Sequence, residues 1–191
     1  MGIPERNKKY TYADYLTWPD EERWEIINGQ VFDMSPAPKS KHQFISANLL
    51  TEIGLYLKGK KCKIVAAPFD VRLFDGLRMN DKDIHTIVQP DLSVFCKENV
   101  IDEKGAIGPP DLVIEILSES SRFKDLNIKL LLYQRHKIQE YWIVDPDTEM
   151  LYQYILEANG LYQIIKEYTK NDTIHPSLFP DLAINLKDIF E

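Results

Sequence analysis

Apolar and polar residues along the first third of the chain predict a helix, a hairpin and a longer helix. TYADYLTWP (11–19) is expected to form a short helix that Pro19 stops. RWEIINGQVFDMSP (23–36) predicts two short strands around Asn28-Gly29, the strongest sequence signal for a two-residue hairpin.

The second helix is predicted between Lys39 and Leu57, where apolar residues recur at helical spacing, and Gly59 ends it. The residues expected to share its apolar face are Phe44, Ala47, Leu50 or Thr51, and Leu55.

The middle of the chain is expected to be rich in strands. KIVAAPFDVRLF (63–74) has strand character, with Pro68 indicating a bulge or an edge, and the polar segment 75–83 reads as a loop. IVQPDLSVFC (87–96) predicts the next strand, and a loop holding Gly105 and Gly108 follows it. PDLVIEILS (110–118) is an almost unbroken apolar run, typical of a central strand buried on both faces.

The last third is expected to add one helix and several strands. Ser120 or Ser121 can cap a helix whose apolar residues are Leu126, Leu130, Ile128 and Leu131. Strands are predicted at 140–146 and in a hairpin formed by 150–156 and 161–168 across EANG, and the tail from Ser177 has enough apolar residues to dock. The whole predicts a mixed α/β (α+β) single domain over 1–191, with a central sheet flanked by helices.

Composition agrees with an ordinary globular protein of 191 residues, 44% of them hydrophobic and 28% charged. No apolar run reaches about 18 residues, so no membrane span or membrane partner is expected. The first residues lack the apolar core of a secretion signal, so a cytoplasmic location is expected. Cys62 and Cys96 fit neither a metal spacing nor a disulfide framework and are expected to be two free thiols.

The net charge of −7 argues against a protein that coats nucleic acid, although clustered carboxylates can themselves form a metal site. The densest basic stretch, KGKKCK (58–63), is either a solvated helix end or a patch that contacts phosphate.

Glu115 is the first residue that calls for a chemical explanation, because it interrupts the apolar run LVIEIL. Burying an ionised carboxylate alone is costly, so a cleft, a basic partner, an exposed edge or a metal ion must compensate. Asp111 cannot share an ion with it, since four residues along a strand separate the two by about 13 Å. Asp111 is instead expected at a strand start or a turn.

Asp91, in the preceding strand, is the better partner for Glu115. If the two strands are neighbours in the sheet, both carboxylates can converge on one position. Two carboxylates together with water and phosphate oxygens typically bind Mg²⁺, and Mn²⁺ can substitute. Such an ion polarises a phosphodiester and orients the attacking water.

Metal-assisted hydrolysis of a phosphodiester also needs a cation that stabilises the developing charge. Many nucleases that cut with a metal ion and two acids carry a lysine two residues after the glutamate, and here that position is Leu117. On the following helix Asp125, Lys129 and Tyr133 recur every four residues as a polar stripe. Lys129 is the candidate that leans toward the end of the sheet. The alternative is a solvated lysine that pairs with Asp125.

The ordered set VFDMSPAP…H, QPDLSVF, PPDLVIEILSESS…D…K…Y and EYWIVDP resembles the Uma-two family of proposed endonucleases in the PD-(D/E)xK superfamily. The resemblance covers about Tyr12 to Tyr154 and implies a restriction-endonuclease-like core. It assigns Asp91 and Glu115 to the metal and Lys129 to the displaced motif lysine. Glu25 and His42 also match family positions and could complete the site or touch phosphate, although His42 can equally be an ordinary helix-start histidine.

Two functional hypotheses follow. The first is a Mg²⁺-dependent endonuclease whose partner is DNA and which uses no organic cofactor; the second is an inactive nuclease fold that binds nucleic acid or serves in assembly. A homodimer through Tyr152, Tyr154 and Tyr162 is compatible with both. Tyr141 and Trp142 in EYWIVDP are expected in the core, with Asp145 starting a turn.

Overall fold

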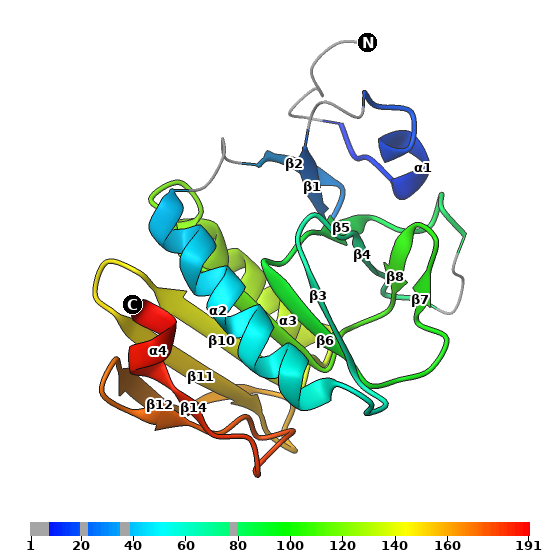
Figure 1. Ribbon diagram of the computed structural model, residues 1–191. Coiled ribbons are helices and arrows are strands. Elements are labelled where there is room, and N and C mark those ends of the chain that lie inside the picture. Colours follow the sequence, from blue (N-terminus) through cyan, green and yellow to red (C-terminus); the bar gives the residue numbers. More distant parts are fainter. Residues whose placement is uncertain (1–7, 20–22, 35–38, 77–79) are drawn as a thin grey trace.

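The computed structural model describes residues 8–19, 23–34, 39–76 and 80–191, and two six-stranded sheets form its framework (Figure 1). The part of the predicted loop at 77–79 and the end of the predicted strand segment at 35–36 lie outside the described residues. Within them, no helix is both long enough and apolar enough to cross a membrane.

The larger sheet has the strand order β12-β11-β10-β9-β6-β3. Its strands are β3 (Lys63–Ala66), β6 (Leu92–Phe95), β9 (Leu112–Ile116), β10 (Glu140–Asp145), β11 (Met150–Leu156) and β12 (Tyr162–Thr169). β9 lies inside this sheet, antiparallel to β6 and parallel to β10, and all five of its residues are buried. The prediction of a central strand is confirmed.

The smaller sheet has the order β2-β1-β5-β4-β8-β7. Its strands are β1 (Trp24–Ile27), β2 (Gln30–Asp33), β4 (Val71–Leu73), β5 (Thr86–Val88), β7 (Ile101–Asp102) and β8 (Gly105–Ile107). The predicted hairpin turn is confirmed, because Asn28 and Gly29 both take the positive φ angles, 54° and 81°, that this turn requires. The expected loop around Gly105 instead contains the β7–β8 hairpin.

Two segments predicted as single strands each divide between the sheets at a proline. The segment 63–74 becomes β3 in the larger sheet and β4 in the smaller one, with a cis bond before Pro68. The segment 87–96 likewise becomes β5 and β6, and Pro90 lies in the gap between them. Proline cannot donate to a strand ladder, so it marks the place where the chain leaves one sheet for the other. Asp91 therefore stands at the junction of the two sheets.

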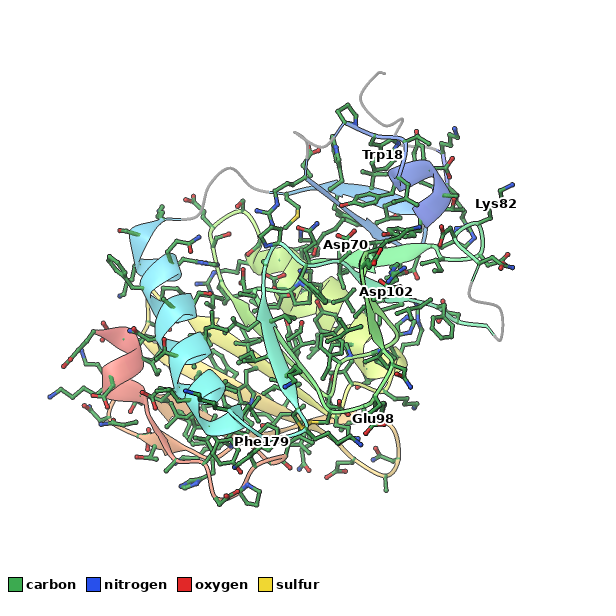
Figure 2. The ribbon with its side chains drawn as sticks, turned by 45° about the vertical axis from the view of Figure 1, so that its right-hand side comes forward. Trp18, Asp70, Lys82, Glu98, Asp102 and Phe179 are labelled. Carbon is green, nitrogen blue, oxygen red and sulfur yellow. A yellow bond between two sulfur atoms is a disulfide. The ribbon has the colours of Figure 1, made fainter. Side chains whose placement is uncertain are left out.

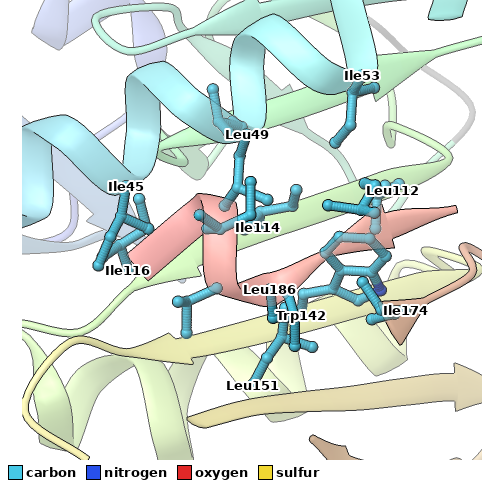
Figure 3. Packing of buried hydrophobic residues seen from close by; sticks show 14 of the residues in the cluster. Ile45, Leu49, Ile53, Leu112, Ile114, Ile116, Trp142, Leu151, Ile174 and Leu186 are labelled. Atoms are coloured by element: carbon cyan, nitrogen blue, oxygen red, sulfur yellow. The ribbon is translucent and has the colours of Figure 1, made fainter. Parts of the chain in front are cut away.

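α2 (Ser40–Leu57) packs on one face of the larger sheet through a stripe at every fourth residue. Figure 3 shows Ile45, Leu49 and Ile53 of this stripe facing Ile116, Ile114 and Leu112 of β9. The predicted apolar face was wrong, because Phe44 and Leu55 are 61% and 66% exposed. Apolar residues occur around much of this helix, so spacing alone could not select the buried stripe.

The other face of the larger sheet is covered by a π-helical turn, η1 (Lys124–Lys129), and by α3 (Leu130–Arg135), which continues from it. α2 and α3 thus lie on opposite sides of the sheet (Figure 1). Among the residues predicted to be apolar contacts of this helix, Leu131 is exposed and Leu126, Ile128 and Leu130 are partly buried.

The N-terminal helix is shorter than predicted. α1 (Tyr12–Tyr15) begins with a capping box between Thr11 and Asp14 and ends well before Pro19, so the proline does not stop it.

The C-terminal predictions hold in outline. β11 and β12 form the expected hairpin, and the tail docks through β13 (Thr173–Ile174), β14 (Ile184–Asn185) and α4 (Leu186–Phe190), with α4 beside α2 (Figure 1). Tyr141 and Trp142 are buried, as expected.

The tyrosines considered for a dimer surface are less exposed than expected. Tyr152, Tyr154 and Tyr162 are all partly buried, and the Tyr162 hydroxyl donates to the Ile138 carbonyl.

Cys62 and Cys96 form a disulfide, so the expectation of two free thiols was wrong. They lie next to the paired residues Lys63 and Phe95 of β3 and β6, at a sequence separation of 34. Only the register of this strand pair brings them together, and spacing along the chain could not show it.

Candidate metal-dependent nuclease site

Lys129 is the centre of a buried charge cluster between the two sheets. Its ammonium Nζ lies 2.8 Å from Glu115 Oε1, 2.8 Å from Glu25 Oε1 and 3.6 Å from Asp125 Oδ1. The Tyr133 hydroxyl donates to the same Glu115 oxygen at 2.7 Å. The stripe formed by Asp125, Lys129 and Tyr133 therefore faces the sheet, and the alternative of a solvated lysine is wrong, although the pair with Asp125 exists.

Asp91 reaches this cluster from the bend at Pro90. Its Oδ2 accepts a 2.7 Å hydrogen bond from the backbone N–H of Ile116, and its own N–H points at Glu115 Oε2 over 3.5 Å. β6 and β9 are neighbours, as the convergence of these two acids requires. His42, at the start of α2, lies with Nε2 3.2 Å from Asp91 Oδ2. All five candidate residues are thus connected.

Asp111 and Leu117 take no part in this cluster. Asp111 Oδ2 accepts from the backbone N–H of Cys96 at 2.7 Å, beside the start of β9. Leu117 is buried in the hydrophobic cluster beneath α3. The reading of Asp111 as a strand-start residue agrees with this position.

Glu25 is completely buried and is surrounded by donors. Its Oε1 accepts from the backbone N–H of Gln89 at 3.0 Å as well as from Lys129, and its Oε2 lies 2.5 Å from Lys124 Nζ. The Gln89 side chain extends this contact further, donating to Asp70 directly before β4 (labelled in Figure 2) and to the hydroxyl of Tyr15 in α1. Glu25 thereby ties the smaller sheet to the lysines of η1.

Lys124 is the member of the cluster that sequence reasoning missed. The only signal available was its place directly before Asp125 in the run Arg122-Phe123-Lys124. Its side chain is 15% exposed, compared with 23% for Asp91, 12% for His42 and 4% for Lys129 and Glu115. Asp91, Lys124 and His42 therefore form the accessible rim, and the remaining members lie beneath it.

The cluster divides its charge unevenly between Glu115 and Glu25. Burial raises the pKa of Glu115 to about 8, with neighbouring Asp125, Asp91 and Glu25 adding to the shift and Lys129 opposing it. Burial also acts to raise the pKa of Glu25, but Lys129 and Lys124 outweigh it and lower the value to about 2. Glu25 is thus the ionised partner of the lysines, and Glu115 retains a proton near neutral pH.

In the basic members of the cluster, burial lowers the pKa and the neighbouring acids raise it. Burial disfavours the charged form of Lys129, but Glu115, Glu25 and Asp125 outweigh it and hold its pKa well above the ordinary value. Burial likewise acts against protonated His42, but its contact with Asp91 prevails and raises the pKa of His42.

The donor set of Asp91 and Glu115 fits Mg²⁺ or Mn²⁺ better than a metal that needs a closed protein cage. Within the described ranges, no group of three or more His, Cys, Asp and Glu side chains is arranged to hold a metal ion. Mg²⁺ commonly binds through one or two carboxylates and keeps several waters. The proton retained by Glu115 also indicates that four carboxylates near two lysines leave negative charge that a divalent cation would neutralise.

Comparison with known proteins places this arrangement in context. Residues 12–187 match the protein family Uma2, described as "Putative restriction endonuclease". The uncharacterized protein slr1290 of Synechocystis is 26% identical over 169 residues, covering 87% of this chain and 84% of that protein. A crystal structure of a putative nuclease of the DUF820 family from Anabaena variabilis superposes with a TM-score of 0.73 at 24% identity, covering 95% of this chain and 97% of that one. At that identity the likeness shows a shared fold.

Proposed function

The chain belongs to the Uma2 family, and from this membership we propose that it is a Mg²⁺-dependent endonuclease that hydrolyses phosphodiester bonds in DNA. The observation that carries the proposal is the position of Asp91, directly before β6, whose backbone N–H lies 3.5 Å from Glu115 Oε2 on the adjacent β9, with Lys129 2.8 Å from the same glutamate. These are an acid pair and a cation of the kind that metal-assisted hydrolysis requires.

Each residue has a distinct role in this proposal. Asp91 and Glu115 would hold the ion, which when bound supplies polarisation of a phosphoryl oxygen and orientation of the attacking water. Lys129 keeps the Glu115 carboxylate in place and offsets negative charge that develops on the phosphate. Tyr133 fixes the same carboxylate through its 2.7 Å hydrogen bond.

Glu25 and His42 act by positioning other residues of the site. Glu25 is completely buried and occupied by Gln89, Lys124 and Lys129, so it is a positioning residue for the lysines. His42 contacts Asp91 Oδ2 and limits the orientations open to that carboxylate.

The test compares two Pro-Asp pairs. Asp91→Asn removes one metal ligand, whereas Asp111→Asn changes the equivalent acid of Pro110-Asp111, whose role is to accept from Cys96 N–H. Purified protein should cut plasmid DNA in Mg²⁺ or Mn²⁺ and bind Mn²⁺ by calorimetry. Asp91→Asn should lose both properties, and Asp111→Asn should keep them because an amide oxygen can accept the same hydrogen bond.

Equal cutting by the wild type and Asp91→Asn would exclude this site. A folded wild type that neither binds Mn²⁺ nor cuts DNA would support the second hypothesis, a nuclease fold retained for binding or assembly.

A further inference from the structure

Lys124 and Lys129 differ in their exposure and in the number of their carboxylate partners. Lys129 is surrounded by three carboxylates and is 4% exposed, so its ammonium is committed to the interior. Lys124 has one carboxylate partner, Glu25, and lies at the rim with 15% of its side chain exposed. Of these two ammoniums, Lys124 is the one that an incoming phosphate can reach.

Glu25 keeps two donors on Oε1 when Lys124 turns away, and only its Oε2 loses the contact with Lys124. Its Oε1 keeps the backbone N–H of Gln89 at 3.0 Å and Lys129 at 2.8 Å after Lys124 moves away. An isolated buried carboxylate would hold its partner strongly, whereas one with two further donors can exchange it at smaller cost. Lys124 is therefore held ready in the free protein and is available to substrate.

Phe123, the preceding residue, is 71% exposed. A phenylalanine ring on the surface contributes nothing to the hydrophobic core, although it stands beside a lysine of the charge cluster. Aromatic rings exposed in this way serve single-stranded nucleic acids as stacking platforms, because every base presents a π-face. In a duplex the bases already stack on one another, and a ring gains little.

We propose that Phe123 and Lys124 form a strand-binding element of the site: Lys124 turns from Glu25 to a backbone phosphate while Phe123 stacks on an unpaired base beside it. This rests on the proposed function and narrows its substrate to DNA with unpaired bases, such as single strands, flaps or gaps. Arg122, on the other side of Phe123, remains paired with Asp145 at 2.9 Å and is not part of the element.

The experiment measures binding of fluorescent single-stranded and duplex oligonucleotides by anisotropy in EDTA, over a series of salt concentrations. The wild type should prefer the single strand. Lys124→Met should reduce the slope of log K against log salt by about 0.7, the value for one lost phosphate contact on a single strand. Lys124→Arg should restore the slope.

Phe123→Ala should act differently, because stacking involves no charge. Its affinity for the single strand should fall at least about fivefold at every salt concentration, with the slope and duplex binding unchanged. Leu131→Ala, which truncates an exposed apolar residue of α3, and Lys166→Met, which removes a lysine paired with one surface aspartate, are matched controls and should behave as the wild type.

An unchanged slope in Lys124→Met, equal losses on single strand and duplex in Phe123→Ala, or no DNA binding by the wild type would each overturn the proposal. The readout needs no metal and no cleavage, so it is separate from the Mn²⁺ binding and cutting tests of Asp91→Asn. Loss of cutting in Asp91→Asn together with a wild-type slope in Lys124→Met would retain the nuclease and discard the strand-binding element.

Discussion

Glu115 and Glu140 are two buried glutamates on neighbouring parallel strands, β9 and β10, and they point to opposite faces of the sheet. Both have a pKa raised first of all by burial. Glu140 has only neutral partners among its hydrogen bonds and maintains the fold, whereas Glu115 pairs with an ammonium and is the acid suited to chemistry.

Glu140 is held entirely by neutral donors. Its Oε1 accepts from the Trp142 indole N–H and the Gln153 amide, both at 2.7 Å, and its Oε2 accepts from the backbone N–H of Leu178 at 3.3 Å. These contacts attach the C-terminal tail to the sheet. Among the described residues no lysine, arginine or histidine forms an ion pair with Glu140, and its role is saturated by the contacts it has.

Glu115 is held by an ammonium and a phenol and lies among further acids. Lys129 and Tyr133 share its Oε1, while its Oε2 faces the N–H of the accessible Asp91. The negative charge around it exceeds what the lysines supply. A buried acid that remains incompletely neutralised beside a partly exposed acid is the arrangement to expect where a cation or a reacting phosphate must enter.

The largest expected effect is on stability, and it tests Lys129, whose ammonium pairs with Glu115. Lys129→Met leaves three buried carboxylates without their shared cation and should lower the free energy of unfolding by about 3–5 kcal/mol in urea denaturation. Lys166→Met, which breaks the exposed pair with Asp172, should cost at most about 1 kcal/mol. Equal stabilities would mean that Lys129 does not hold the cluster.

The comparison itself is tested by making the same change in both glutamates. If the proposed function holds, Glu115→Gln should reduce Mg²⁺-dependent cleavage at least about 100-fold, because it removes one of the two carboxylates proposed to bind the metal. Glu140→Gln should leave the rate per folded molecule unchanged. A similar loss in both variants, measured on plasmid relaxation with folded fractions determined by circular dichroism, would show that Glu115 acts only through the fold.

Glu140→Gln should instead show its effect in stability. The NH₂ group of the new amide would face either the Leu178 N–H or the Trp142 and Gln153 donors. At least one of these donors would then lose its acceptor. The expected loss is about 1–3 kcal/mol in the free energy of unfolding. Faster hydrogen exchange at the Leu178 amide would locate the effect, and protection equal to the wild type would contradict it.

The stability of the metal-free protein should depend on pH, because the raised pKa of Glu115 favours its protonated form in the folded state. Its folded pKa of about 8 exceeds the ordinary 4.5, so its contribution is fully present below pH 4.5 and is lost as the pH rises toward 8. Glu25 is unaffected in this window, because its lowered pKa of about 2 makes its contribution constant above 4.5. The groups that face Glu115 are Lys129, Tyr133, Asp125, Asp91 and Glu25.

Unfolding in EDTA should therefore show a fall in stability of up to about 1.4 kcal/mol per pH unit between pH 5 and 8, and Glu115→Gln should flatten that part of the curve. Parallel curves for the two proteins would show that Glu115 titrates normally in the folded chain. Added Mg²⁺ should also flatten the wild-type curve, since it replaces the proton.

Sequence reasoning found the central strand and singled out the glutamate buried in it, because a glutamate in an apolar run is informative wherever the fold places it. It also placed Asp111 at a strand start, which agrees with its position beside β9. Lys129 needed the resemblance to a family as well, because a lysine on a helix has several possible directions. The structure supplies the direction: the π-turn of η1 aims Lys129 into the sheet.

What the sequence could not provide depends on contacts between distant segments. Pro68 was visible as an irregularity, Pro90 was not, and nothing local showed that the chain changes sheets at either proline. The disulfide between Cys62 and Cys96 follows from strand register, and the buried stripe of α2 follows from the surface it meets. Lys124 escaped notice because its partner, Glu25, is 99 positions away.

The π-turn also decides which side chains of this helix can share one partner. A π-helix closes its hydrogen bonds one residue later than an α-helix, so η1 accommodates an extra residue between its two lysines. In a regular α-helix of the same length the two lysines, five residues apart, would lie about 140° apart around the axis, whereas the wider π-turn lets both reach Glu25. Substitutions that restore regular α-helical hydrogen bonds over residues 124–129 should therefore separate the two ammoniums, so the helix type decides that both lysines share one carboxylate.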